Sequence, residues 1–151
     1  MPTSRATTAR SASSRSADDL LLAARRSLAE ASLAGTAGER YACAHLAGLR
    51  AAAAVLAARG RPSGGRRSRV LSVWVLLPQV APELGEWATF FASGARKRAA
   101  AEAGIDVVSH READDLVRDA ESFVLRVCDL LGVPHQWTMA APGASVLRHV
   151  G

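Results

Sequence analysis

Four long stretches of the chain repeat apolar residues every three to four positions, the spacing that places them on one face of an α-helix. The clearest covers residues 109–131, where Ser109 and Glu112 form a capping box and Gly132 marks the end. Its predicted buried face contains Ala113, Leu116, Val117, Ala120, Phe123, Val124, Val127 and Leu131. The pattern therefore predicts an amphipathic helix that packs against other helices through this face.

Two more long helices are predicted in the first half of the chain. One begins near residues 16–18 and ends at Gly35. The next begins with a second capping box, formed by Thr36 and Glu39, and ends at Gly60. Both are expected to bury an apolar stripe, so they pack against each other and against the last helix.

A short helix and another long one are predicted between these. Ser72 is expected to cap the short helix over residues 72–80, which closes one end of the core. Pro82 suits the first turn of the long helix, which is expected to run to Gly104. Its aromatic residues are expected in the core: Trp87, Phe90 and Phe91. Gly94 costs about 1 kcal/mol relative to Ala inside a helix, so we expect another helix to approach closely there.

These elements predict an all-α protein, an antiparallel bundle of four to five helices over residues 17–132. The only stretch that could form a strand, residues 70–77, would have no partner strand. Residues 1–16 are rich in Ser, Thr, Ala and Arg without periodicity, and a disordered basic tail is expected there. We also expect a mobile arginine-rich loop over residues 60–70 and a loose C-terminal tail over residues 133–151.

The composition is typical of one cytoplasmic domain, with 49% hydrophobic residues among 151. The longest apolar run, residues 51–58, is far shorter than the roughly 20 residues of a membrane span. No apolar segment follows the N-terminal arginines as it would in a secretory signal. Cys43 and Cys128 lie far apart, so two free thiols are expected. The four histidines have no ligand spacing, and we expect neither a metal nor another cofactor.

The basic charge lies mainly on the segments expected to be flexible. Residues 1–16 hold three arginines and residues 59–69 hold five, whereas the folded body holds 10 of the 19 basic and all 14 acidic residues, about −4. Basic arms can bind phosphate backbones through counterion release, although charge runs are often only solvated. The candidate nucleic-acid contacts are Arg59, Arg61, Arg66, Arg67, Arg69, Arg96, Lys97 and Arg98.

Two of these charged groups have a second interpretation. The cluster at residues 96–98 lies near the end of a predicted helix, where cations also interact with the negative end of the helix dipole. The acidic residues at 112–121 could hold a divalent ion, but Arg111 and Arg118 lie among them. That pattern favours a solvated helix face with ion pairs three and four residues apart.

One arginine and one histidine have the spacing of a motif found in small helical ribonucleases. Arg40 and His45 form R-x4-H, whereas no arginine precedes His110, His135 or His149 at a comparable distance. On a helical wheel His45 falls within the apolar stripe and Arg40 falls on the opposite face. A metal-free ribonuclease needs both side chains on one phosphodiester. We therefore favour a core histidine and an arginine that is solvated or paired with an acid.

Three stretches of the sequence together resemble an actinobacterial family of HEPN-domain proteins: ERYACAHLAGLRAAAAVLAARG, SVWVLLPQVAPELGEWATFFASGARKRAAAEAG and SHREADDLVRDAESFVLRV. The resemblance covers roughly residues 17–131 and implies an up-and-down bundle of four to five helices, commonly a dimer. HEPN domains divide into ribonucleases and non-catalytic members. The latter partner nucleotidyltransferases or other proteins, or bind nucleotides and nucleic acid.

The ribonuclease motif of this family normally lies in the C-terminal half of the domain, whereas Arg40 and His45 lie in the second predicted helix. The resemblance therefore favours a non-catalytic module, associated with nucleic acid or with a protein partner in a stress or DNA-damage context. A metal-independent ribonuclease that uses Arg40 and His45 is the alternative. Expected partners are RNA or DNA through the arginine-rich loop, a second copy of the chain, a nucleotidyltransferase or a component of a DNA-repair polymerase.

Overall fold

The structure is a computed structural model that describes residues 3–60 and 72–134. Within these ranges it is helical and contains no strand, so the predicted all-α fold class is confirmed. The elements are α1 (Thr3–Leu33), α2 (Ala37–Arg59), α3 (Val73–Val80), the 3-10 helix η2 (Pro82–Leu84), α4 (Gly85–Ser93), α5 (Ala95–Glu102) and α6 (His110–Leu131).

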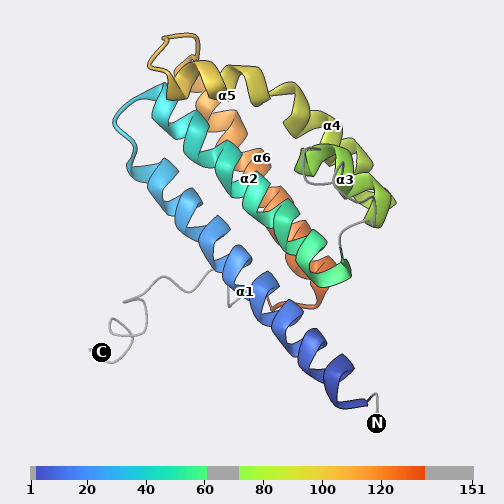
Figure 1. The fold of residues 1–151 in the computed structure, drawn as a ribbon. Coiled ribbons are helices and arrows are strands. Elements are labelled where there is room, and N and C mark those ends of the chain that lie inside the picture. The colour runs from blue at the N-terminus through green and yellow to red at the C-terminus, as the bar shows by residue number, and fades with distance from the viewer. Residues whose placement is uncertain (1–2, 61–71, 135–151) are drawn as a thin grey trace, which may run out of the picture.

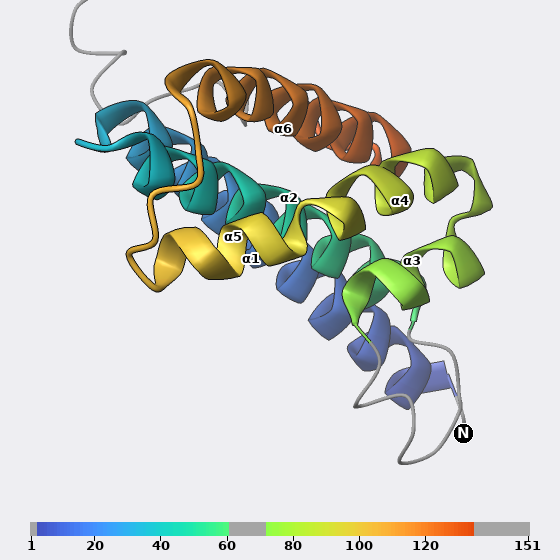
Figure 2. The same cartoon turned by 90° about the horizontal axis from the view of Figure 1, so that it is seen from above.

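The helices form an up-and-down bundle with α2 at its centre (Figure 1). Helix α2 packs against α1, α3, α5 and α6. In Figures 1 and 2, α1 runs antiparallel to α2, the chain returns through α3, α4 and α5, and α6 then runs back alongside α2. The bundle therefore places the start of α2, the end of α5 and the start of α6 at one end of the molecule.

The predicted caps define the start of α2 and of α6. The Thr36 hydroxyl accepts a hydrogen bond from the Glu39 N–H, and the Ser109 hydroxyl accepts one from the Glu112 N–H, each at 3.1 Å. These bonds satisfy amide donors that have no partner within the first helical turn. At the end of α6, Gly132 has φ 71°, a left-handed conformation that glycine adopts without steric cost.

Helix α1 begins at Thr3, well before the start near residues 16–18 that the apolar pattern predicted. Among the side chains that the structure describes on α1, Ala17 is the first buried one. Residues 3–16 contain no proline or glycine that would stop a helix, so a helix can extend through them. This differs from the disordered tail expected for residues 1–16.

The long third helix predicted from Pro82 to Gly104 is wrong as a continuous element, because the structure divides it into η2, α4 and α5. The break between α4 and α5 lies at Gly94, where a Cβ would come within 2.7 Å of the Tyr41 hydroxyl and 3.4 Å of His45 Cδ2. The close approach expected at Gly94 is thus confirmed. Helix α4 therefore ends at the point where the chain lies against Tyr41 and His45 of α2.

The core is aromatic where α2, α3, α4 and α6 meet. Trp74 stacks on Phe91 with ring centroids 4.8 Å apart, and Phe123 lies 5.1 Å from Phe91. Phe91 and Phe123 are fully buried, and Trp87 is partly buried beside them. Phe90, which was predicted in the core, is 39% exposed. That prediction is wrong, because Phe90 lies on the side of α4 that the neighbouring helices leave open.

Among the described residues, one helix is long and apolar enough to cross a membrane, α2 at Ala37–Arg59. More than half of its apolar window is buried inside the bundle. Helix α2 is apolar along its length because four other helices pack around it in the core.

We predict that Gly48→Ala destabilises the bundle by about 1–3 kcal/mol. A Cβ at Gly48 would lie 2.5 Å from Phe91 Cε1 and 2.7 Å from Phe91 Cζ, so the buried ring would have to move. Gly85→Ala is the matched control, because nothing lies within 4 Å of its Cβ position. Urea unfolding measures both, and equal stability of the two variants would contradict this account of the core.

Candidate functional site

His45 lies at the centre of the bundle and is 1% exposed. Its Nε2 lies 2.8 Å from the Phe91 carbonyl oxygen. Because a carbonyl only accepts, Nε2 carries the proton and donates. The ring also lies edge-on to Trp74 and Phe91, with centroids 6.0 and 5.7 Å away. The core histidine expected from the helical wheel is therefore what the structure contains.

Burial lowers the pKa of His45 below its ordinary value of 6.5, because the charged ring would lose its hydration. The Phe91 carbonyl opposes this shift, and the nearby Arg98 guanidinium adds to it. The other ring nitrogen, Nδ1, is buried without a hydrogen-bond partner among the described residues. The ring is thus held neutral.

Arg40 points to a different part of the fold. Its Nη1 donates to Asp114 of α6 at 2.7 Å, and its Nε donates to the Ala31 carbonyl at the end of α1 at 3.3 Å. Arg40 thus ties α2 to both neighbouring helices. Within one copy of the chain, Arg40 and His45 serve separate contacts, and the structure does not bring them together on a common surface.

Among the eight basic candidates for nucleic-acid contact, Arg61, Arg66, Arg67 and Arg69 lie outside the described residues. Three of the remaining four are paired with acids. Arg59 donates to Glu83 at 2.7 Å, Lys97 to Glu112 at 2.7 Å, and Arg98 Nε lies 3.7 Å from Glu102. Arg96 is exposed.

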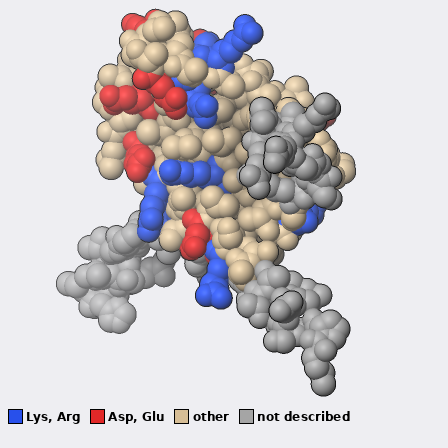
Figure 3. Space-filling model, in the orientation of Figure 1, with Lys and Arg blue, Asp and Glu red and all other residues tan. Residues whose placement is uncertain are grey.

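These ion pairs reduce the positive charge that the described surface presents to a ligand. The hydrogen bond to Glu112 raises the pKa of Lys97, as expected for an ammonium beside a carboxylate. Figure 3 shows blue and red groups interspersed over the visible face, with no continuous basic surface in the described part. Residues 96–98 therefore do not form a basic patch together, because two of these three residues are paired with acids.

In the described part of the chain, one pocket between helices lies at the end of the bundle where α2 and α6 begin. This bundle-end pocket has a volume of about 680 Å³. It is lined by residues 35–39, Ala101 and residues 104–110. Ile105 and Val107, in the connection between α5 and α6, are 56% and 44% exposed beside it.

The second pocket is a groove of about 330 Å³ between α6 and the α4–α5 side, which we call the acidic groove. Helix α6 contributes Glu112, Asp115, Leu116 and Asp119. The opposite wall is formed by Phe90 and Lys97, with Tyr41 of α2 also lining the groove. The Lys97–Glu112 ion pair bridges α5 and α6 here.

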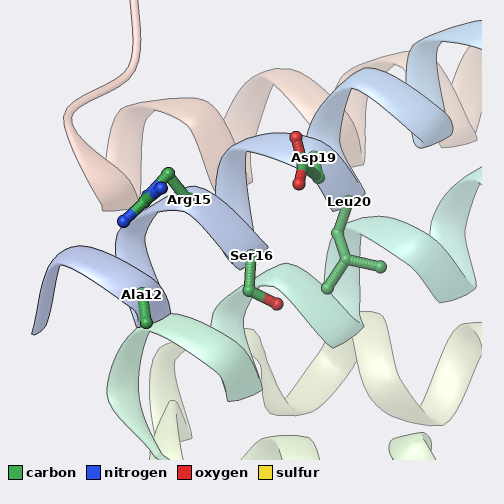
Figure 4. A pocket seen from close by; sticks show the side chains of 5 residues that line it. All are labelled: Ala12, Arg15, Ser16, Asp19 and Leu20. Atoms are coloured by element: carbon green, nitrogen blue, oxygen red, sulfur yellow. The ribbon is translucent and has the colours of Figure 1, made fainter. Parts of the chain in front are cut away.

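A third pocket lies on α1 (Figure 4). All five side chains that line it come from this one helix, and Arg15 and Asp19 are one turn apart. Among the residues that the structure describes, no second element contributes to this pocket, so it gathers no functional groups from different helices.

The cysteines and acids provide no metal centre in the described part of the chain. Cys43 and Cys128 are free thiols, as expected. Burial raises the pKa of Cys43, which makes the thiolate scarcer at neutral pH. No group of three or more potential metal ligands occurs among the described residues. Asp115 is paired with Arg118, three residues away on the same helix.

The sequence did not indicate that the buried Tyr41 and the exposed Phe90 line one groove. Tyr41 lies in the apolar stripe of α2, and Phe90 is next to the buried Phe91. An available signal was the acidic spacing at residues 112, 115 and 119, which places three carboxylates on one face of α6.

With its buried aromatic core and central α2, the chain has the architecture of a small all-helical domain. The SAV_6107-like HEPN family matches residues 29–128. Because this match covers well over half of the chain, the chain belongs to that HEPN family. No curated protein matches the chain, and no solved structure does.

We predict that the stability of the bundle falls as the pH decreases below 6.5, and that His45→Gln reduces this fall. In that range an unfolded histidine gains a proton, while the buried His45 stays neutral because its pKa is lowered. One such group contributes a slope of at most about 1.4 kcal/mol per pH unit. Glutamine keeps an N–H donor for the Phe91 carbonyl and does not titrate.

Urea unfolding at a series of pH values measures the effect. The control is His110→Gln, which changes an exposed histidine at the start of α6. An unchanged pH slope in His45→Gln would contradict the assignment of the acid sensitivity to this ring.

Proposed function

We propose that this HEPN chain is a non-catalytic module that binds a protein partner through its bundle-end pocket. The observation that carries the proposal is a group of exposed apolar side chains at this end. Leu33 is 86% exposed at the end of α1, and Ile105 and Val107 lie beside the pocket. Both segments lie at the same end of the bundle (Figures 1 and 2).

Exposed apolar side chains beside a concave surface are typical of protein interfaces, where their burial releases water. Single exposed apolar residues are common, but here Ile105 and Val107 both line one pocket of about 680 Å³, and Leu33 lies at the end of α1, two residues before Gly35 of its lining. The non-catalytic part is supported by the separate contacts of Arg40 and His45, which engage both side chains inside the fold. The partner classes suggested by the HEPN resemblance are a nucleotidyltransferase and a component of a DNA-repair polymerase.

We predict that the double change Ile105→Asp with Val107→Asp abolishes partner binding and leaves the fold intact. Two carboxylates in the contact would have to lose their hydration when the partner docks. Co-purification of the tagged chain from its native cells, with mass spectrometry, measures the bound partner. The matched control is Val75→Asp, which changes an exposed apolar residue on α3, away from this pocket.

The result is interpreted together with thermal unfolding of each variant. A specific partner that is absent from the double variant and kept by the control supports the proposal. A partner retained by a folded double variant would show that the bundle end is not the contact.

A second candidate function is nucleic-acid binding through residues 61–69, which contain four arginines and no acid. Because each phosphate contact releases counterions, the affinity for RNA or DNA should fall steeply with salt. Replacing the four arginines with alanine should reduce the slope of log affinity against log salt by about 0.7–0.9 for each arginine that binds a phosphate. Arg148→Ala, which removes a basic residue outside this segment, is the control.

Fluorescence anisotropy with a labelled oligonucleotide measures this slope. Binding that does not depend on salt, or that survives the four substitutions, would exclude this segment as the contact. Cleavage of the oligonucleotide without added metal, abolished by both Arg40→Ala and His45→Gln, would favour the ribonuclease alternative.

A further inference from the structure

Helix α5 is attached to the bundle by fewer buried contacts than the other helices. It buries none of its residues, whereas every other α-helix in the described chain has buried residues. Its Ala101 is only partly buried, against the core and beside Gly38 of α2. An exposed ion pair between Lys97 and Glu112 joins it to α6. Because segments with few buried contacts open at a low free energy, we expect α5 to open while the rest of the bundle stays folded.

Glycines lie just outside both ends of this helix. Gly104 follows α5 with φ 80°, and nothing lies within 4 Å of its Cβ position. Gly94 precedes α5 and lies against Tyr41, next to the hydrogen bond between His45 and the Phe91 carbonyl. Small residues at the ends of an element can absorb large changes in φ and ψ. Helix α5 can therefore rotate as a unit between the two glycines, while α4 stays attached to α2 through the bond to His45.

Two buried polar atoms lack a hydrogen-bond partner where α5 packs on α2. They are Nδ1 of His45, on α2, and Nε of Arg98, on α5, and neither has a partner among the described residues. Glu102 Oε1 lies 3.7 Å from Arg98 Nε, which is too far for a hydrogen bond. The Arg98 guanidinium is near enough to His45 to lower the pKa of the ring. Opening of α5 would let water reach both atoms, so their unmet hydrogen bonds favour the open state.

We propose that α5 is a lid that opens about Gly94 and Gly104 and uncovers the face of α2 beside the bundle-end pocket. Helix α5 lies on the outside of the bundle next to α2 (Figure 2), and its Ala101 forms part of the pocket wall. Opening the lid lengthens the pocket along α2 toward Tyr41 and His45. The role of the lid in admitting a partner rests on the proposed function, whereas the opening itself does not.

Native-state hydrogen exchange of the full chain, followed by NMR at several low urea concentrations, measures the opening of each helix. We expect the amides of α5 to exchange at least about a hundredfold faster than the buried amides of α2 and α6. Their exchange should depend little on urea, because opening of one short helix exposes little surface. Lys97→Met should speed the exchange of α5 up to about fivefold by removing the exposed ion pair. Arg96→Met is the matched control, because this exposed cation of the same helix forms no ion pair with the described residues.

A disulfide between Gly38→Cys and Ala101→Cys provides a lock for the lid. A Cβ at Gly38 would lie 3.5 Å from the Ala101 Cβ, a separation that a disulfide spans. Cys43→Ala in the same chain removes the other accessible thiol, since Cys128 is fully buried. Oxidation should slow the exchange of α5 at least about tenfold relative to the reduced form of the same variant. Exchange of α5 should then show the urea dependence of α2 and α6, because only unfolding of the bundle would release it.

Exchange of α5 at the same rate and with the same urea dependence as α2 and α6 would overturn the proposal. Fast exchange of α5 that persists in the oxidised variant would also overturn it, because such exchange would come from fraying within the helix. If the cysteine pair disturbs the fold, equal exchange of α5 in Lys97→Met and Arg96→Met has the same consequence.

The role of the lid is tested separately, by co-purification with the oxidised and the reduced variant. A partner that depends on Ile105 and Val107 should bind the reduced form more strongly. Equal binding of that partner to both forms would exclude the lid from partner recognition and leave the proposed function intact. If neither form binds a partner, the proposed function fails, and the exchange measurements still decide whether α5 opens.

Discussion

The hydrogen bond from His45 to the Phe91 carbonyl is the contact on which the arrangement of the bundle depends. At 2.8 Å it joins the central helix to the last turn of α4, where the chain breaks at Gly94 before α5 begins. The Phe91 carbonyl also accepts from the Gly94 N–H at 3.1 Å, and a neutral imidazole adds a second donor at less cost than a buried charge. The glycine permits the approach, and the aromatic rings around it exclude water. Because α4 and α5 diverge there, Phe90 and Lys97 come to face α6 across the acidic groove.

A second constraint is the balance of charge within the folded body. Arg40, Arg59 and Lys97 each bind a carboxylate on another element. Arg59 and Lys97, which the sequence suggested as phosphate contacts, therefore join helices in the structure. Such exposed pairs contribute about 0–1 kcal/mol each, so their main effect is on the surface potential. The described body therefore offers apolar contacts and carboxylates, while residues 61–69 carry an excess of arginine over acids.

Structural features that depend only on residues nearby in the chain can be predicted from the sequence. The caps at Thr36 and Ser109, and the burial of His45, follow from spacing within one helix and agree with the structure. The break at Gly94 depends on Tyr41 and His45 of another helix, so periodicity within residues 82–104 contains no sign of it. Phe90 and Phe91 have similar local surroundings, and only the direction in which α4 packs decides which one is buried. The first residues of α1 have no apolar stripe, so a search for periodicity does not detect them.

The R-x4-H spacing illustrates why a motif has to be considered together with the helix that carries it. Five residues along a helix turn the chain by about 500°, which leaves Arg40 and His45 on opposite faces of α2. On a core helix one face has to be buried, so such a spacing directs one member inward and the other outward. The histidine then satisfies a backbone group and the arginine joins neighbouring helices. Recognition of a partner by this HEPN chain is therefore best sought on the surfaces that the bundle leaves apolar or uncompensated, at Ile105 and Val107 and along the acidic groove.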